Sequence, residues 1–182
     1  MKATGIVRRI DELGRVVIPK EIRRTLHIRE SDPLEIFTDR EGQIILKKYS
    51  PIGELSAFAK QYAESLAQTL GCLVCICDMD QVIAASGVGK KELQGKELSI
   101  QYQKAVEARS SIMAQMGEQK SVNVLSGQQE EYLGEVIHPI ICEGDVVGSV
   151  MLLTKEPKRK FADTEFKMVS CAASCLGKQM EQ

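Results

Sequence analysis

The chain has 182 residues, of which 43% are hydrophobic and 27% charged, a composition typical of a soluble globular protein. No apolar run approaches the roughly 20 residues that span a bilayer, and the first residues lack the apolar stretch of a signal peptide. These properties argue against a membrane protein and against export. We therefore expect a cytoplasmic protein whose six cysteines are reduced thiols.

The formal net charge of −1 hides an asymmetry between the two ends of the chain. Residues 1–29 hold eight Lys and Arg against three Asp and Glu, whereas residues 51–182 hold 13 against 17. A basic end on a near-neutral chain favours a local site for a polyanion. The alternative is a solvated basic surface, and charge alone does not separate the two.

The first fifty residues predict the order β-β-α-β-β. Two segments rich in β-branched residues surround a turn at Gly14, and Pro19 is well placed to begin a helix because its missing N–H costs nothing there. The turn at residues 39–42 contains Gly42, which can supply a positive φ in a hairpin. We expect the four strands at residues 4–11, 15–18, 34–38 and 43–48, and the helix at residues 19–27.

The predicted helix is apolar on one side and basic on the other. Ile22 and Leu26 can dock on a sheet, which leaves the basic side outward. Four basic residues fall at i, i+3, i+4 and i+7 and so share one stripe: Lys20, Arg23, Arg24 and His27. Taken alone, this pattern also fits an ordinary amphipathic helix whose charged face is exposed to solvent.

Arginines in or beside the first two strands favour the DNA-binding interpretation of that stripe. The planar guanidinium group donates two parallel hydrogen bonds, which suits phosphate and guanine. A module of fifty residues is also marginal as a monomer, and one short helix cannot cover the apolar side chains of four strands. We therefore expect a dimer that duplicates the basic set and binds double-stranded DNA. The candidate DNA-binding residues are Arg8, Arg9, Arg15, Lys20, Arg23 and Arg24.

Residues 3–49, and above all the run from Ala3 to Pro19, resemble the DNA-binding domain of AbrB-type transition-state regulators. The resemblance implies a swapped-hairpin, β-barrel-like dimer in which the two chains interleave. It also implies DNA contacts by Arg8, Arg15, Arg23 and Arg24, with a basic residue at Arg9. The sequence departs from the family at His27, where many relatives have Gly or Arg, and at Ser31, where Gly often precedes Asp32.

The remaining residues predict a second domain, 52–182, after a first domain of residues 1–51. Helical apolar spacing over residues 52–70 suits either a helix that covers its own domain or a contact between subunits. A final helix is expected at residues 164–180, with Asp163 as its N-cap. Between these helices we expect strands at residues 72–77, 81–85, 121–125, 134–141 and 146–154, a helix near residues 98–109, and a tight hairpin turn at residues 142–145.

This order predicts an α+β fold, with a GAF-like α/β sandwich as the second domain. The resemblance rests on the element order and on the hairpin from Gly144 to Ser149. GAF domains in many proteins sense a small molecule, so an unknown effector is one expectation and an oligomerisation role is the other. The two halves together resemble regulators of spore-forming bacteria that join an AbrB-type domain to a GAF domain. That resemblance implies activation and repression of sporulation genes in the forespore by a homotetramer.

Other chemistry is not favoured by the sequence. The apolar run that holds Cys72, Cys75 and Cys77 predicts buried thiols rather than a metal site, and Cys171 and Cys175 are expected to pack against the domain. The segment Gly87–Lys91 lacks the first glycine and the Ser or Thr of a phosphate-binding loop. His138, in an apolar strand, is expected to be a core or pocket residue rather than a general base. We therefore predict no enzyme activity, no metal and no cofactor.

A protein-interaction module is the rival interpretation from another functional class. Swapped-hairpin domains also occur in antitoxins, which bind a toxin through a C-terminal tail. Such tails are usually short and disordered, whereas about 130 residues with the pattern of a folded domain follow the first domain here.

Overall fold

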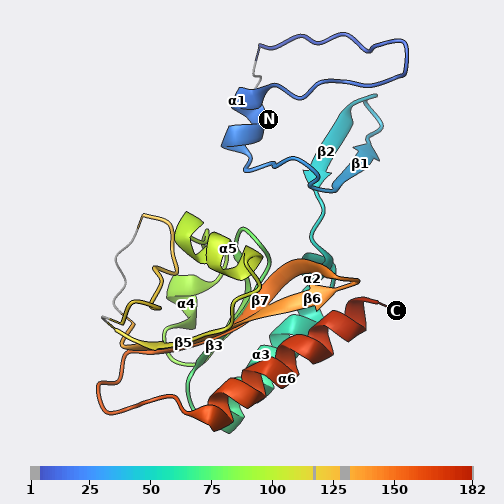
Figure 1. Cartoon of the computed structure of the whole chain (residues 1–182). Coiled ribbons are helices and arrows are strands. Elements are labelled where there is room, and N and C mark those ends of the chain that lie inside the picture. Colours follow the sequence, from blue (N-terminus) through green and yellow to red (C-terminus); the bar gives the residue numbers. More distant parts are fainter. Residues whose placement is uncertain (1–4, 117, 128–131, 182) are drawn as a thin grey trace. The chain divides into compact units, whose positions relative to one another are not determined.

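The computed structural model describes residues 5–116, 118–127 and 132–181, and the chain divides into two compact units, Met1–Tyr49 and Ser50–Gln182 (Figure 1). The boundary falls between Tyr49 and Ser50, and each of these two residues is hydrogen-bonded within its own unit. The backbone N–H of Tyr49 donates to the carbonyl of Pro33 at 3.0 Å, within the first unit. The hydroxyl of Ser50 accepts from the N–H of Gly53 at 3.0 Å and donates to Asp78 at 3.0 Å, within the second.

The first unit contains one short helix and one hairpin. Helix α1 spans Lys20–Thr25, strand β1 spans Leu34–Thr38 and strand β2 spans Ile44–Lys48. The two strands pair antiparallel in a register that runs from Thr38 opposite Ile44 to Leu34 opposite Lys48. The predicted hairpin is therefore confirmed. Its turn depends on Gly42, whose φ is 78°, a conformation that side chains with a Cβ rarely adopt.

The strands expected at residues 4–11 and 15–18 are absent from the described residues 5–18, and Thr4 lies outside the described residues. These residues form a wide, open loop with separated arms (Figure 1). Near its tip, the N–H of Asp11 donates to the carbonyl of Arg15 at 3.0 Å. A strand exists only when it hydrogen-bonds to a neighbour, and β1 and β2 pair with each other. The sequence favours extended arms, but in the single chain the arms form no ladder with each other or with the free edges of the β1–β2 hairpin.

The first unit has no core of its own. Among residues 5–49, which the structure describes throughout, Pro19 alone is buried. Leu26 was expected to dock on a sheet, yet its side chain is 57% exposed. Large apolar side chains from every part of the unit are exposed: Ile6, Val7, Ile10, Leu13, Val16, Val17, Leu26, Ile36, Phe37, Ile44, Ile45 and Leu46.

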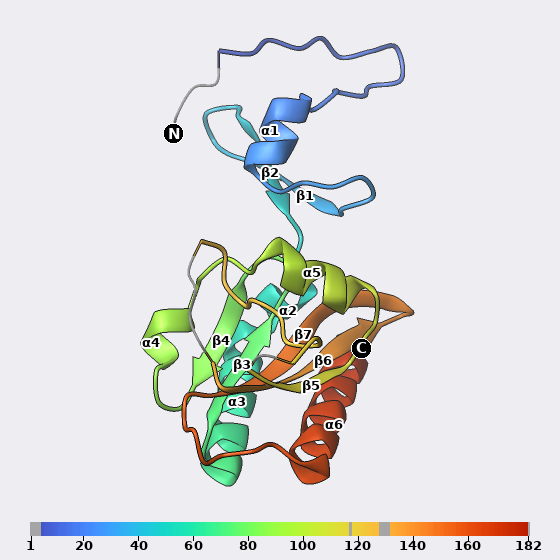
Figure 2. The same ribbon diagram turned by 60° about the vertical axis from the view of Figure 1, so that its left-hand side comes forward.

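The second unit is a five-stranded antiparallel sheet with the strand order β4-β3-β7-β6-β5 and helices on both faces (Figure 2). Helices α3 and α6 cover one face, and α4 and α5 lie over the other (Figure 2). The strands are β3 Leu73–Cys77, β4 Val82–Ser86, β5 Ile112–Gln115, β6 Gly134–Cys142 and β7 Asp145–Thr154; the helices are α2 Pro51–Glu54, α3 Ser56–Leu70, α4 Lys90–Leu93, α5 Ile100–Glu107 and α6 Asp163–Met180.

Each face of this sheet has its own core. Alternating side chains of the central strands divide between the two faces, so that Val74 and Ile76 of β3 pack beneath α3 and α6 while Cys75 and Cys77 face the other way. The contact between α6 and the sheet is close because it is made at a glycine. A Cβ on Gly177 would lie 2.1 Å from the carbonyl oxygen of Ile141.

Most of the predicted elements of the second unit are present, with several differences. The helix expected over residues 52–70 is two helices, α2 and α3, and Ala162 rather than Asp163 precedes the first residue of α6. The strand expected at residues 121–125 is wrong, because that segment makes only an isolated bridge between Leu125 and Leu98. The edge strand is β5 instead, and α4 is a helical turn that the sequence analysis missed.

Candidate nucleic-acid interface

Helix α1 brings together three of the six predicted DNA-binding residues. Lys20, Arg23 and Arg24 lie on one face at i, i+3 and i+4, with Lys20 and Arg24 exposed and Arg23 half-buried. Pro19 precedes the helix with a φ of −57°, and the N–H of Arg23 donates back to its carbonyl at 3.0 Å. The helix thus starts at a defined residue and presents two exposed cationic groups one turn apart.

His27 does not extend this face, contrary to the sequence prediction. The helix ends at Thr25, and His27 has a φ of 52°, in the left-handed region. The N–H of Ile28 donates to the carbonyl of Arg23 at 2.8 Å, and the N–H of His27 to the carbonyl of Arg24 at 3.4 Å. These two bonds define a Schellman C-cap, in which the residue at the position of His27 is usually Gly. Ser31, with a φ of 68°, is a second left-handed residue.

The end of α1 is tied to the β1–β2 hairpin by Lys48. Its ammonium group lies 2.9 Å from the carboxylate of Asp32 and donates to the carbonyl of His27 at 3.2 Å. The same carboxylate oxygen of Asp32 accepts from the N–H of Arg29 at 2.7 Å. Sequence reasoning missed this network. The hairpin register could have revealed it, because Lys48 pairs with Leu34 and so lies diagonally opposite Asp32 on the same side.

The other predicted DNA-binding residues lie on the open loop before α1. Arg8, Arg9 and Arg15 are exposed, with Arg8 and Arg9 on one arm and Arg15 just past the turn. Arg15 donates from Nε to the Asp11 carboxylate at 2.8 Å. Hydrogen bonds from the backbone N–H and the side chain of Arg15 hold the pKa of Asp11 below its usual value. One chain therefore carries all six residues on the surface but distributes them over two elements.

The thiols differ partly from expectation. Cys72, Cys75 and Cys77 are buried as predicted, and burial raises the pKa of Cys72 to about 11. The expectation that Cys171 and Cys175 pack against the domain is wrong, because both are exposed on α6. They lie near Tyr62 of α3, and partial burial together with the neighbouring Cys175 raises the pKa of Tyr62 to about 12.

His138 is half-buried and packs edge-on against Phe166, with ring centroids 6.1 Å apart. Among the described residues, no group of three or more His, Cys, Asp and Glu side chains could hold a metal ion. None of the described helices is long and apolar enough to cross a membrane.

The fold and the six basic residues on α1 and on the loop before it together define a class of protein. It is a DNA-binding transcription regulator with an AbrB-type first domain and a GAF-like second domain. Over 51 residues, the chain is 71% identical to the transition state regulatory protein AbrB of Bacillus subtilis (strain 168). These residues are 28% of this chain and 52% of AbrB. The PixJ GAF domain of Thermosynechococcus elongatus matches 74% of this chain and 89% of its own, with a TM-score of 0.56 and 16% identity. That likeness shows the GAF fold of the second unit.

The chain belongs to the stage V sporulation protein T family. It is 51% identical to stage V sporulation protein T of Bacillus subtilis (strain 168) over 100% of both chains. The family model described as "Stage V sporulation protein T C-terminal, transcription factor" matches residues 54–181. A second family model, described as "Antidote-toxin recognition MazE, bacterial antitoxin", matches residues 7–54. The family is one of transcription factors and not of enzymes.

Proposed function

We propose that the first units of two chains interleave into one domain that binds double-stranded DNA and regulates transcription of sporulation genes in the forespore. The observation that carries this proposal is the exposure of twelve large apolar side chains in a unit that buries only Pro19 among residues 5–49. Burial of one fully exposed side chain of this kind contributes roughly 1.5–3 kcal/mol, so a second chain that covers most of the twelve can offset the cost of association.

The arms of the open loop supply the other half of this argument. Residues 6–10 hold three apolar side chains, Ile6, Val7 and Ile10, beside Arg8 and Arg9, and residues 16–18 are all apolar after Arg15. When such arms pair as strands in an interleaved dimer, they can bury apolar side chains against the second chain, while the arginines extend their guanidinium groups to solvent on long apolar stems. Two copies of each arginine then flank the two copies of α1, an arrangement that suits a duplex with two similar backbones.

The DNA-binding residues in this proposal are Arg8, Arg9, Arg15, Lys20, Arg23 and Arg24. If eight phosphates are neutralised per dimer, the logarithm of the affinity should fall with the logarithm of the salt concentration with a slope of roughly −7. The double substitution Arg23→Ala and Arg24→Ala removes four cations per dimer. Specific binding should then be lost and the remaining salt slope should be shallower by up to about 4.

A gel-shift assay on native promoter fragments across a salt series tests this assignment. The matched control is the double substitution Lys167→Ala and Lys178→Ala, which removes the same charge from exposed positions of α6 in the second unit. The control should bind DNA as the wild-type chain does, and both variants should keep the oligomeric state of the wild-type chain in sedimentation. Specific binding by the Arg23→Ala, Arg24→Ala variant at moderate salt would show that these residues are not the site.

For the second unit we propose an oligomerisation role that assembles dimers into a homotetramer, in a protein that acts in the cytoplasm. Light scattering of the full chain, compared with a chain that ends at Tyr49, measures that contribution. An antitoxin role for the first unit is less well supported, because residues 50–182 form a folded unit with two buried cores rather than a short tail. Co-purification with a small basic protein would favour the antitoxin role instead.

A further inference from the structure

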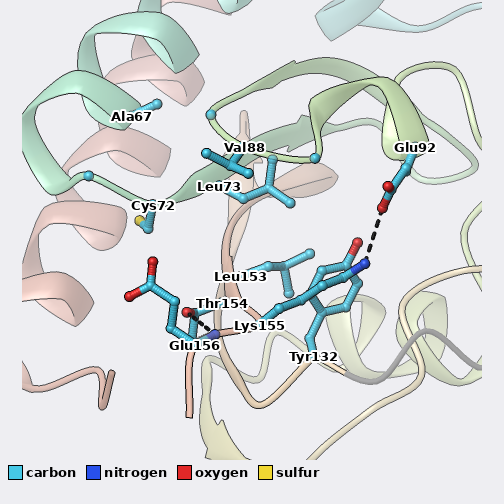
Figure 3. Close-up of a pocket in the computed structure, with 13 residues that line it drawn as sticks. Ala67, Cys72, Leu73, Val88, Glu92, Tyr132, Leu153, Thr154, Lys155 and Glu156 are labelled. Atoms are coloured by element: carbon cyan, nitrogen blue, oxygen red, sulfur yellow. Dashed lines mark hydrogen bonds and ion pairs between the residues drawn. The ribbon is translucent and has the colours of Figure 1, made fainter. Parts of the chain in front are cut away.

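The second unit contains a cavity of about 430 Å³ at one end of the sheet, where β3 and β6 begin and β4 and β7 end (Figure 3). This volume lies in the range of small-molecule sites. Two leucines, Leu73 of β3 and Leu153 of β7, form its apolar middle, and Val88 lies at its rim with 94% of its side chain exposed.

The charged groups of the cavity are arranged around this apolar middle. On one side, Lys155 pairs with Glu92 at 3.1 Å and lies over the ring of Tyr132, 5.1 Å from its centroid. On the other side, the lining includes Glu156 and Cys72 (Figure 3). Two carboxylates against one ammonium group leave the lining with a net charge of −1.

The nearby cation Arg159 does not line the cavity. Its guanidinium group donates to the carbonyl of Gly71 at 2.7 Å and to the carbonyl of Leu70, and it lies over the ring of Phe161 at 5.7 Å. Arg159 therefore holds the wall at the end of α3. Because Lys155 already covers the ring of Tyr132, the lining offers a ligand excess carboxylate and apolar walls, and that combination favours a cation with an apolar body.

We infer that this cavity binds a small organic cation, with its apolar part against Leu73 and Leu153 and its charged group near Glu156. The inference goes beyond the proposed DNA-binding function and does not depend on it, because binding to the cavity can be measured without DNA. An effector of this class would give the GAF-like unit a sensing role in addition to oligomerisation.

Cys72 supplies the readout, because it lines the cavity and keeps 8% of its surface exposed, whereas Cys75 and Cys77 have no exposed surface. The experiment uses the full chain with Cys142, Cys171 and Cys175 changed to Ser, which removes the three thiols that are not buried. Alkylation of Cys72 by N-ethylmaleimide is followed by mass spectrometry in the presence of benzylammonium, benzyl alcohol or benzoate at equal concentration. The three probes share one ring and differ in charge.

We expect benzylammonium to slow alkylation of Cys72 at least five-fold, benzyl alcohol to slow it less, and benzoate to leave it unchanged. Glu156→Gln should bring the effects of benzylammonium and benzyl alcohol together, because it removes the charge that distinguishes them. Val88→Trp should obstruct the rim and abolish the protection, whereas Ile100→Trp, at a position that is 67% exposed on α5, should not. Equal protection by benzoate, protection that survives Val88→Trp, or no protection by any probe would overturn the inference.

Discussion

Asp11 and Asp39 occupy equivalent positions in two turns of the same geometry. In each turn the aspartate Oδ1 accepts hydrogen bonds from the backbone N–H groups two and four residues later, at 2.8–3.0 Å. A glycine with a φ of 75° or 78° stands three residues after each aspartate. The second turn continues into the five pairs of β1 and β2, whereas the arms of the first continue as an open loop. The first turn therefore has the geometry of a hairpin turn, but in one chain the arms on either side of it do not pair as strands.

The Asp11 turn should control the freedom of Arg15. Asp11→Asn keeps an acceptor oxygen for the turn but removes the charge that pairs with Arg15, so we expect DNA affinity to rise about two- to five-fold at low salt. Asp11→Ala removes the turn acceptor as well and should weaken binding. Gel-shift titrations measure both. The matched control Asp39→Asn alters the equivalent turn, whose aspartate has no arginine partner at the same place, and should leave affinity nearly unchanged.

The same pair predicts a pH dependence. Because the pKa of Asp11 in the folded chain is below its ordinary value of 3.8, the carboxylate stabilises the turn above that pH, and this contribution is lost as the pH falls through the lower folded value. The exchange rate of the Arg15 amide hydrogen, corrected for intrinsic pH effects, should rise below pH 4 in the wild-type chain. In Asp11→Asn the corrected rate should show no such step, and a step that persists would identify another group as its origin.

Lys48 should stabilise the end of α1 through Asp32 and His27. Lys48→Met removes both contacts while keeping the length of the side chain, and we expect a loss of about 1–2 kcal/mol. Hydrogen exchange of the Ile28 amide, which closes the helix onto Arg23, should become about 5- to 30-fold faster. Lys47→Met changes the neighbouring exposed residue and is the control; equal acceleration in both variants would mean that the Lys48 contacts do not hold the helix end.

His27→Gly should stabilise the first unit and leave DNA binding unchanged. A residue with a Cβ costs roughly 1–2 kcal/mol in the left-handed region, and part of that gain is offset by the larger freedom of Gly in the unfolded chain. We expect a net gain of about 0.5–1 kcal/mol, measured by denaturant unfolding monitored in the first unit. Thr25→Gly, inside the helix, should instead lose stability. A marked loss of DNA affinity in His27→Gly would return His27 to the basic face.

Gly177→Ala tests the contact between α6 and β6. The added Cβ would lie 2.1 Å from the Ile141 carbonyl oxygen, so the helix must move away from the strand, at a cost of about 2–3 kcal/mol. Thermal unfolding of the second unit measures this loss. Ser174→Ala, at an exposed position of the same helix, should change stability by less than about 0.5 kcal/mol. An equally stable Gly177→Ala variant would contradict the close approach.

Much of this protein could be predicted from its sequence because the signals are local. The Asp–Gly turns, the Pro19 helix start, the paired strands around residues 142–145 and the basic face of α1 each depend on residues within a few positions of one another. The AbrB-type resemblance added the expectation of a partner chain. The open loop at residues 5–18 and the twelve exposed apolar side chains agree with that expectation, because a second chain would both pair with the loop and cover these side chains.

Only the tertiary structure decided which residues meet across the chain. It selected β5 over residues 121–125 as the edge strand, exposed Cys171 and Cys175 on α6, and turned His27 out of the basic stripe. It also joined Lys48 to Asp32 and enclosed a cavity between strand ends that are distant in sequence. Strand pairing depends on long-range register and packing; periodicity along a single segment indicates which face is apolar but not which segment will pack against it.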